Sequence, residues 1–215
     1  MNTIDIQEVF RILKKELKDY TIPLAEQIHF KTKKPLYVLI GTLLSSRTKD
    51  DITAKACNKL FKNIKNLEDL EKLDIKKIEK LIYPVGFYKT KAKHLKELPK
   101  VLKEKFDGDV PSEINELVQL PGVGRKTANL VTSVAFNKPG ICVDTHVHRI
   151  MNRLGYIKTN TPLETETKLR QKLPKELWKE TNYYFVILGQ NICRPTNPNC
   201  KGCPLNNICS RNNVK

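Results

Sequence analysis

The sequence predicts an all-α fold. Apolar residues recur at the three- and four-residue spacing of an amphipathic helix in five separate segments. Proline and glycine separate these segments at intervals that suit helices of common length. Only residues 140–143 suggest a strand, and so short a run predicts no sheet.

The amphipathic segments are spread from the N-terminus to residue 154. Their apolar stripes lie within residues 6–17, 52–64, 75–82, 95–102 and 147–154. A further segment, residues 36–44, is apolar on most of its sides, which is typical of a helix buried at the centre of a domain. Turns are expected between the helices at Pro84 to Gly86 and at residues 107–111, 121–124 and 139–140.

The length of 215 residues leaves room for one large domain or two small ones. No stretch approaches the roughly 20 apolar residues that a membrane span needs. Residues 1–10 carry acids and no apolar signal core. We therefore expect a soluble protein that stays inside the cell.

The chain is strongly basic, with 39 Lys and Arg against 23 Asp and Glu and a formal net charge of +16. Such an excess makes polyanions, and nucleic acid in particular, the expected partners. A plainer interpretation is that many of the lysines only solvate helix faces. If nucleic acid is the partner, the affinity should fall steeply with salt, because each neutralised phosphate releases counterions.

Residues 113–136 are expected to form two helices, 113–119 and 125–136, joined by the turn LPGVG. Gly122 and Gly124 permit a positive φ and the close approach of another backbone. The second helix begins there, and its N–H groups and dipole can hold a DNA phosphate without a side chain. This pattern is typical of a helix-hairpin-helix motif, with DNA contacts from Gly122, Val123, Gly124 and Arg125. An ordinary helical hairpin with glycine in its turn is the alternative.

Lys126 falls in the first turn of the second helix, beside the proposed DNA contact. A lysine amine has an ordinary pKa of about 10.4 and is almost fully protonated at neutral pH, so a nucleophilic lysine needs burial or neighbouring positive charge. The helix N-terminus supplies part of that effect. The sequence thus suggests Lys126 as a nucleophile, with a simple phosphate contact as the alternative.

Asp144 follows eighteen residues later, in VDTHVHR, directly before an apolar helical stripe. It is expected to cap that helix. A capping carboxylate can also stabilise positive charge at a sugar and accept protons, so the two roles are compatible. His146 and His148 are two residues apart and do not share a helix face, which argues against a metal pair.

The C-terminal cysteines follow the pattern C-x6-C-x2-C-x5-C, in a segment rich in proline and glycine that suggests a loop wrapped round a metal. They are Cys193, Cys200, Cys203 and Cys209. Disulfides do not suit an intracellular, DNA-binding composition, whereas zinc and an iron-sulfur cluster both suit four thiolates. Arg194 and Lys201 lie between the cysteines and offer further phosphate contacts.

The segments LPGVGRKTAN and VDTHVHRIMNRLG together resemble the endonuclease III family of DNA repair enzymes. The resemblance runs from about Leu36 to Cys209. It implies that Lys126 and Asp144 are the catalytic pair of a bifunctional DNA glycosylase and abasic-site lyase. A damaged pyrimidine is flipped out of the duplex, the lysine attacks the glycosidic carbon, and the resulting imine eliminates the 3′ phosphate.

The same resemblance implies a [4Fe-4S] cluster on the four cysteines and double-stranded DNA with oxidised pyrimidines or abasic sites as the substrate. A monomer acting in the cytoplasm, on nucleoid DNA, is expected. Related mismatch glycosylases carry a tyrosine or serine at the position of Lys126, which argues against a monofunctional mismatch glycosylase. A non-enzymatic DNA-binding module that keeps the hairpin and the metal loop for structure is the rival from another class.

Two residues are expected to fill the gap that a flipped base leaves. Arg47 occupies the position of a glutamine that enters the gap in the family, and Phe87 the position of an apolar wedge. An exposed arginine and a core phenylalanine are the alternatives.

The resemblance also implies two helical domains with the active site in the cleft between them. Residues 28–138 are expected to form a six-helix domain that contains the helix-hairpin-helix motif at about 113–136. Residues 1–27 and 139–215 are expected to form a discontinuous helical domain that carries the cluster loop 193–209.

Overall fold

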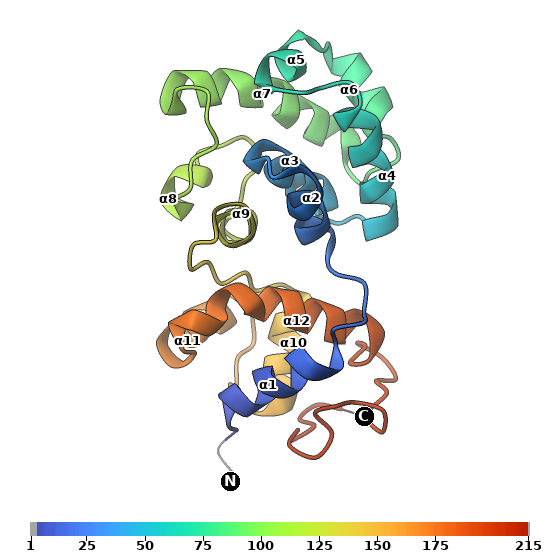
Figure 1. Ribbon diagram of the computed structural model, residues 1–215, viewed down its shortest axis with the longest axis vertical. Helices are drawn as coiled ribbons and strands as arrows, with labels where there is room; N and C mark the ends of the chain where they lie inside the picture. Colours follow the sequence, from blue (N-terminus) through green and yellow to red (C-terminus); the bar gives the residue numbers. More distant parts are fainter. Residues whose placement is uncertain (1–3, 215) are drawn as a thin grey trace. The chain divides into compact units, whose positions relative to one another are not determined.

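Every regular element between residues 4 and 214, the part of the chain that this computed structural model describes, is a helix (Figure 1). The predicted all-α fold is confirmed, and residues 140–143 form no strand. No helix in this part of the chain is both long and apolar enough to cross a lipid bilayer.

The chain divides into two compact units. One takes the two ends of the chain, up to Pro23 and from Pro139, and the other is Leu24–Lys138. Each unit has its own apolar core. The central unit therefore begins four residues earlier than the expected position 28, because the helix that starts at Leu24 belongs to it entirely.

The central unit contains eight helices, where six were expected; the two shortest have six and four residues. They are α2 (Leu24–Thr32), α3 (Pro35–Ser45), α4 (Asp50–Phe61), α5 (Leu67–Lys72), α6 (Ile75–Ile82), α7 (Tyr88–Phe106), α8 (Ile114–Leu117) and α9 (Arg125–Phe136).

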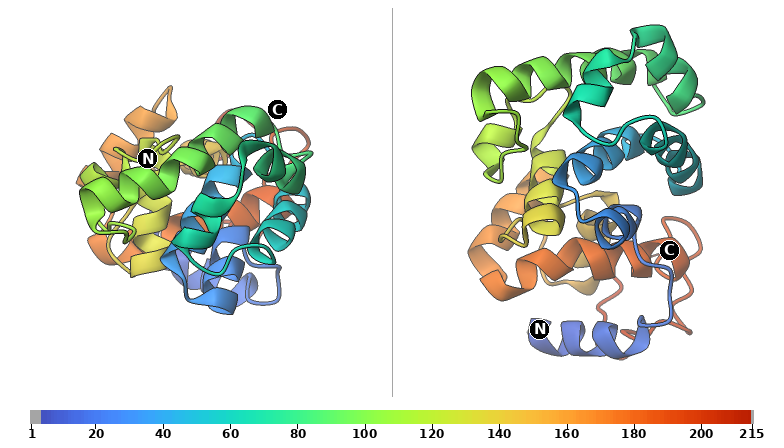
Figure 2. Two further views of the ribbon diagram at one scale, coloured as in Figure 1. Left: turned by 90° about the horizontal axis from the view of Figure 1, so that it is seen from above. Right: turned by 45° about the horizontal axis from the view of Figure 1, so that its top comes forward.

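Helix α3 lies at the centre of this unit and packs against α2, α4, α7 and α9. Its residues from Tyr37 to Leu44 are all buried, as expected for a helix that is apolar on most of its sides. Pro35 occupies its first turn, where the missing N–H costs nothing. The long helix α7, coloured green in Figure 2, packs against α5 and α6 as well as α3.

The unit built from the chain ends contains, between residues 4 and 214, five helical elements and an irregular C-terminal segment. They are α1 (Ile6–Glu16), α10 (Thr145–Leu154), α11 (Pro162–Lys172), the short 3-10 helix η1 (Lys175–Leu177) and α12 (Trp178–Asn191). Helix α12 packs against α1, α10 and η1. In the core of this unit the rings of Phe10 and Phe185 pack edge to face, with centroids 5.7 Å apart.

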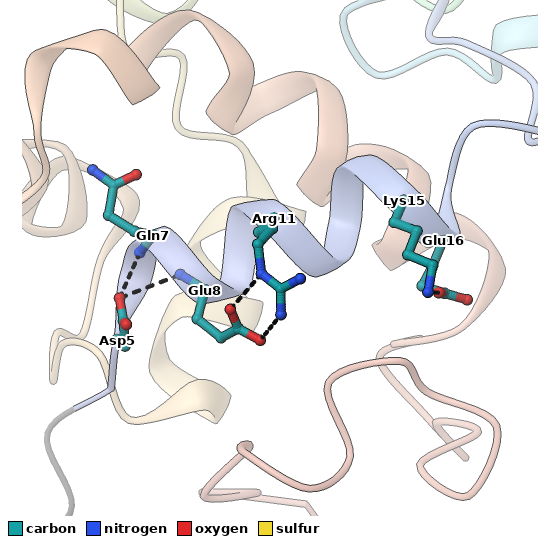
Figure 3. A network of polar contacts seen from close by, with 6 residues as sticks. All are labelled: Asp5, Gln7, Glu8, Arg11, Lys15 and Glu16. Atoms are coloured by element: carbon teal, nitrogen blue, oxygen red, sulfur yellow. Dashed lines mark hydrogen bonds and ion pairs between the residues drawn. The ribbon is translucent and has the colours of Figure 1, made fainter.

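Helix α1 shows how local sequence sets a helix in place (Figure 3). The Asp5 carboxylate accepts hydrogen bonds from the backbone N–H groups of Gln7 and Glu8, at 3.0 and 3.2 Å, and so caps the first turn. Glu8 pairs with Arg11 one turn later, at 2.6 Å. The opposite face carries Val9 and other apolar residues into the core.

Candidate active site and nucleic-acid interface

The hairpin expected at 113–136 is formed by α8 and α9, joined by residues 118–124. Gly122 has φ +73°, a conformation that disfavours any other residue. A Cβ at this position would also lie 2.3 Å from Nδ1 of His94. Both the backbone conformation and the packing of the turn therefore require glycine at position 122.

Gly124 is different, since its φ of −90° and ψ of 172° suit any residue and nothing lies within 4 Å of where a Cβ would be. It is the N-cap of α9 and offers no side chain to cap the first turn. The first turn of a helix leaves N–H groups without intrahelical partners, and the dipole favours an anion there. Open space at Gly124 thus gives an anion access to the start of α9.

The neighbours of Gly124 divide into one buried and two exposed side chains. Val123 is buried in the core of the central unit, and its N–H bonds to the carbonyl of Leu120 at 3.1 Å. It anchors the turn and is not placed to contact DNA through its side chain. Arg125 and Lys126 are the first two residues of α9 and both are exposed.

Asp144 is the N-cap of α10, as the sequence predicts. Its Oδ1 accepts from the backbone N–H groups of His146 and Val147, both at 2.9 Å. Within residues 4–214 no donor is found for Oδ2, so one oxygen of this half-buried carboxylate remains available to a substrate. Lys126 and Asp144 belong to different units, Lys126 to the central one.

Arg47 and Phe87 lie together in the central unit, although forty residues separate them. Arg47 follows the end of α3 and Phe87 precedes α7, both in the left-handed backbone region, with φ of +53° and +56°. The Arg47 guanidinium carbon lies 5.5 Å from the Phe87 ring centroid. Phe87 is 62% exposed, so the alternative of a core phenylalanine is wrong.

A pocket of about 240 Å³ adjoins this pair. Its wall includes Leu43, Arg47, Phe87, His94 and Gly122, which connects the pair with the hairpin turn. The wall also includes Lys91, which the sequence interpretation missed. The missed signal was its position four residues before Leu95, which places it on the buried face of α7.

The four C-terminal cysteines line one pocket, together with Arg153 of α10. They are free, half-buried thiols. Burial, together with the nearby thiols of the other three cysteines, raises the pKa of Cys203 to about 11. Within the part of the chain that the structure describes, no three His, Cys, Asp or Glu side chains are arranged to hold a single metal ion.

Arg153 ties this cysteine segment to α10. Its guanidinium donates to Sγ of Cys193 at 3.3 Å and to the carbonyls of Arg194 and Pro195 at 2.6 and 2.8 Å. It is 7% exposed, so these bonds are shielded from water. Arg194 and Lys201, the other two suggested phosphate contacts, are both exposed on the same segment.

Comparison with known proteins identifies the family. Residues 40–175 match the family described as HhH-GPD superfamily base excision DNA repair protein. Endonuclease III of Thermotoga maritima is 48% identical over 179 residues, which cover 83% of this chain and 84% of that one.

Two solved structures are similar over nearly the whole chain. One is a non-covalent endonuclease III–DNA complex, with a TM-score of 0.86, 33% identity and coverage of 98% of this chain and 96% of that one. The other is a trapped endonuclease III–DNA covalent intermediate, with a TM-score of 0.80, 32% identity and 97% coverage of both chains. The chain therefore belongs to the endonuclease III family, within the HhH-GPD superfamily of base excision DNA repair proteins.

Proposed function

We propose that this chain is a bifunctional DNA glycosylase and abasic-site lyase that uses Lys126 as its nucleophile and Asp144 as its carboxylate. The observation that carries the proposal is the position of Lys126, in the exposed first turn of α9 directly after the open turn at Gly124. A related protein 32% identical to this chain has been trapped as a covalent intermediate with DNA, as a nucleophilic amine requires.

The start of α9 binds the DNA backbone. A phosphate sits at the uncapped first turn, where the dipole and N–H groups stabilise it. Arg125 and the net charge of +16 add long-range attraction. Arg194 and Lys201 contribute further phosphate contacts from the cysteine segment.

The chemistry proceeds in two stages. The Lys126 amine forms a bond to C1′ of an extruded nucleotide while the bond from C1′ to the damaged base breaks. The C1′–O4′ bond then breaks as O4′ takes up a proton, and the nitrogen of Lys126 becomes a protonated imine with C1′. This imine acidifies C2′, and loss of a C2′ proton breaks the C3′–O3′ bond and expels the 3′ phosphate. Asp144 stabilises positive charge at the sugar and accepts protons through Oδ2, because Oδ1 is committed to the helix cap.

Lys126 is exposed in the protein without DNA, so the water around its amine must be displaced by the substrate. The two catalytic residues come from different units, and the proposal requires that both act on one nucleotide. The substrates are oxidised pyrimidines and abasic sites in double-stranded DNA, and the enzyme acts as a monomer on nucleoid DNA in the cytoplasm.

Cys193, Cys200, Cys203 and Cys209 hold a [4Fe-4S] cluster. Four sulfurs around one tetrahedral zinc, with bonds of about 2.3 Å, would lie about 3.8 Å apart. A [4Fe-4S] cluster would take one thiolate ligand from each of the four cysteines. The cysteines line one pocket, and membership of the endonuclease III family favours the cluster over zinc.

When bound, the cluster supplies positive iron centres that neutralise four thiolates crowded into a half-buried pocket. Arg153 donates to Cys193 Sγ and the backbone N–H of Arg211 to Cys209 Sγ, at 3.3 and 3.4 Å. Donors of this kind orient thiolate ligands. A cluster bound to these four cysteines would fix the segment that carries Arg194 and Lys201.

The test is borohydride trapping on a duplex with an abasic site. We expect a covalent adduct from the native chain, none from Lys126→Ala, and an adduct at reduced affinity from the neighbouring control Arg125→Ala. An adduct that survives Lys126→Ala would move the nucleophile elsewhere, and no adduct or strand cleavage from the native chain would favour the non-enzymatic DNA-binding module. Iron and sulfide analysis separates the cluster from zinc.

A further inference from the structure

Lys91 is a buried lysine, 9% exposed, on the inward face of α7. Its Nζ donates to the carbonyls of Leu44 and Ser46, at 2.8 and 2.6 Å, and to Oγ1 of Thr48 at 3.4 Å. No carboxylate is among these partners. A buried ammonium normally needs an opposite charge, and burial lowers the pKa of Lys91 to about 8.

The acceptors of Lys91 surround one residue, Arg47. Leu44 and Ser46 lie at the end of α3, where backbone carbonyls have no intrahelical partner and carry partial negative charge. The ammonium of Lys91 takes up two of these carbonyls. Since Ser46 and Thr48 flank Arg47, Lys91 fixes the chain on both sides of it.

The segment that precedes Phe87 also contacts the chain at Arg47 and Thr48. The backbone N–H of Gly86 donates to Thr48 Oγ1 at 3.1 Å, so this hydroxyl links Gly86 with Lys91. A Cβ on Gly86 would lie 2.6 Å from the carbonyl oxygen of Arg47. Segments 46–48 and 86–87 are therefore in backbone contact.

We propose that Lys91 is a positioning residue: acting through Thr48 and Gly86, it holds Arg47 and Phe87 as one stacked pair that enters the DNA base stack as a unit. The proposal rests on the proposed function. Both residues of the pair have left-handed backbones, which persist only where surrounding contacts enforce them. Lys91 supplies such contacts, and the ordering that wedge insertion requires is complete before DNA binds.

The proposal predicts that loss of Lys91 affects cleavage of duplex and single-stranded substrates differently. A flipped nucleotide leaves a gap only in a duplex, so only duplex substrates need the Arg47–Phe87 pair. An abasic site in a single strand presents the same sugar and phosphate to Lys126 without a stack to enter. Loss of Lys91 should therefore slow cleavage of the duplex and spare the single strand.

The experiment compares single-turnover cleavage of one abasic oligonucleotide, alone and paired with its complement, by the native chain and Lys91→Met. We expect the duplex rate to fall by up to about 100-fold, the loss that a misplacement of about 1 Å can cause, and the single-strand rate to stay near native. With 2-aminopurine opposite the abasic site, the fluorescence change that follows pair insertion should shrink in Lys91→Met.

Lys96→Met is the matched control, because Lys96 lies on the same helix and also donates to two backbone carbonyls, those of Glu71 and Leu73, at 2.7 and 2.8 Å. It should leave both rates unchanged. Adding Lys91→Met to a variant that already carries Arg47→Ala and Phe87→Ala should slow the duplex reaction no further, since the two changes act through the same pair.

Equal losses on both substrates, an additive loss in the combined variant, or the same selective loss from Lys96→Met would overturn the proposal. If Lys91→Met does not fold, Thr48→Ala removes the shared hydroxyl and should give the same duplex-selective loss; its absence would also overturn the proposal. Failure of the native chain to cleave either substrate would instead refute the proposed function.

Discussion

Replacing Glu26 with glutamine should stabilise the protein at neutral and alkaline pH. Glu26 lies in the first turn of α2 and is 8% exposed, and within residues 4–214 its Oε2 is buried without a hydrogen-bond partner. Burial raises its pKa to about 7; its own backbone N–H opposes this rise, and the Asp50 carboxylate adds to it. Glutamine keeps the size and shape of the side chain without the charge.

The sign and the size follow from the two pKa values. The folded chain holds the Glu26 proton up to about pH 7, whereas an unfolded glutamate releases it at its ordinary pKa of 4.5. The contribution of Glu26 to the free energy of unfolding is therefore most favourable below pH 4.5, falls as the pH rises to 7, and carries the full penalty above that. At about 1.4 kcal/mol per pH unit, the rise in pKa from 4.5 to about 7 gives a penalty of at most about 3.5 kcal/mol.

The assay is urea unfolding, followed by circular dichroism, of the native chain and Glu26→Gln between pH 4.5 and 8.5. At pH 8 the variant should be more stable by about 2–3 kcal/mol, and the advantage should vanish near pH 4.5. Glu68→Gln makes the same change at an exposed position in the first turn of α5 and should shift stability by less than about 0.5 kcal/mol. An advantage that is absent at pH 8, or the same at every pH, would refute this account of Glu26.

Three further predictions concern the site. Asp144→Asn keeps the helix cap, so the free energy of unfolding should change by less than about 0.5 kcal/mol, while base removal should slow by about 100-fold. Asp144→Ala should also lower the free energy of unfolding by about 1 kcal/mol. Gly124→Ala should leave stability unchanged and weaken DNA binding by about tenfold in a titration at fixed salt. Gly122→Ala should instead lower the free energy of unfolding by about 1–2 kcal/mol. Arg153→Met should speed iron loss to a chelator by about tenfold, because Cys193 loses its side-chain donor.

Each of these has an outcome that contradicts it. Full activity in Asp144→Asn would show that the residue serves only as a cap. Destabilisation of Gly124→Ala equal to that of Gly122→Ala would mean that both glycines serve the conformation of the turn. Unchanged iron retention in Arg153→Met would show that its bonds to the backbone of the cysteine segment are independent of the ligands.

The sequence predicts best those helices that have one apolar face and a clear end signal. The range 125–136 matches α9 to the residue, because Gly122 and Gly124 precede it and Asn137 ends it at φ +54°. Helix α12 was not recognised, since it is buried on most sides and shows no single stripe. Helix α11 could have been found, because Thr161 and Glu164 have the spacing of a capping box, Pro162 occupies the first position, and the Thr161 hydroxyl accepts from the backbone N–H of Glu164.

The features of the candidate site also fall into two groups, those that local sequence predicts and those that depend on how distant segments pack. Spacing alone locates the hairpin turn, Asp144 at a helix start and the four cysteines, because each depends on residues near one another in the chain. The Arg47–Phe87 contact and the Lys91 bonds join segments about forty residues apart. Such contacts depend on how α3 and α7 pack, and no local pattern reports them. Chemistry can therefore be predicted from motifs, whereas positioning needs the fold.

Glu26 and Lys91 are buried titratable residues of opposite charge in the same unit, and their surroundings differ in a way that separates their roles. Burial shifts the pKa of both toward neutrality. Lys91 has three acceptors within residues 44–48, while Glu26 has a buried oxygen without a donor in the described chain. A buried charge lowers stability unless its bonds compensate. Substitution at Glu26 should therefore raise stability and leave the Arg47–Phe87 pair unchanged, whereas substitution at Lys91 should change the geometry of that pair, on which duplex cleavage depends.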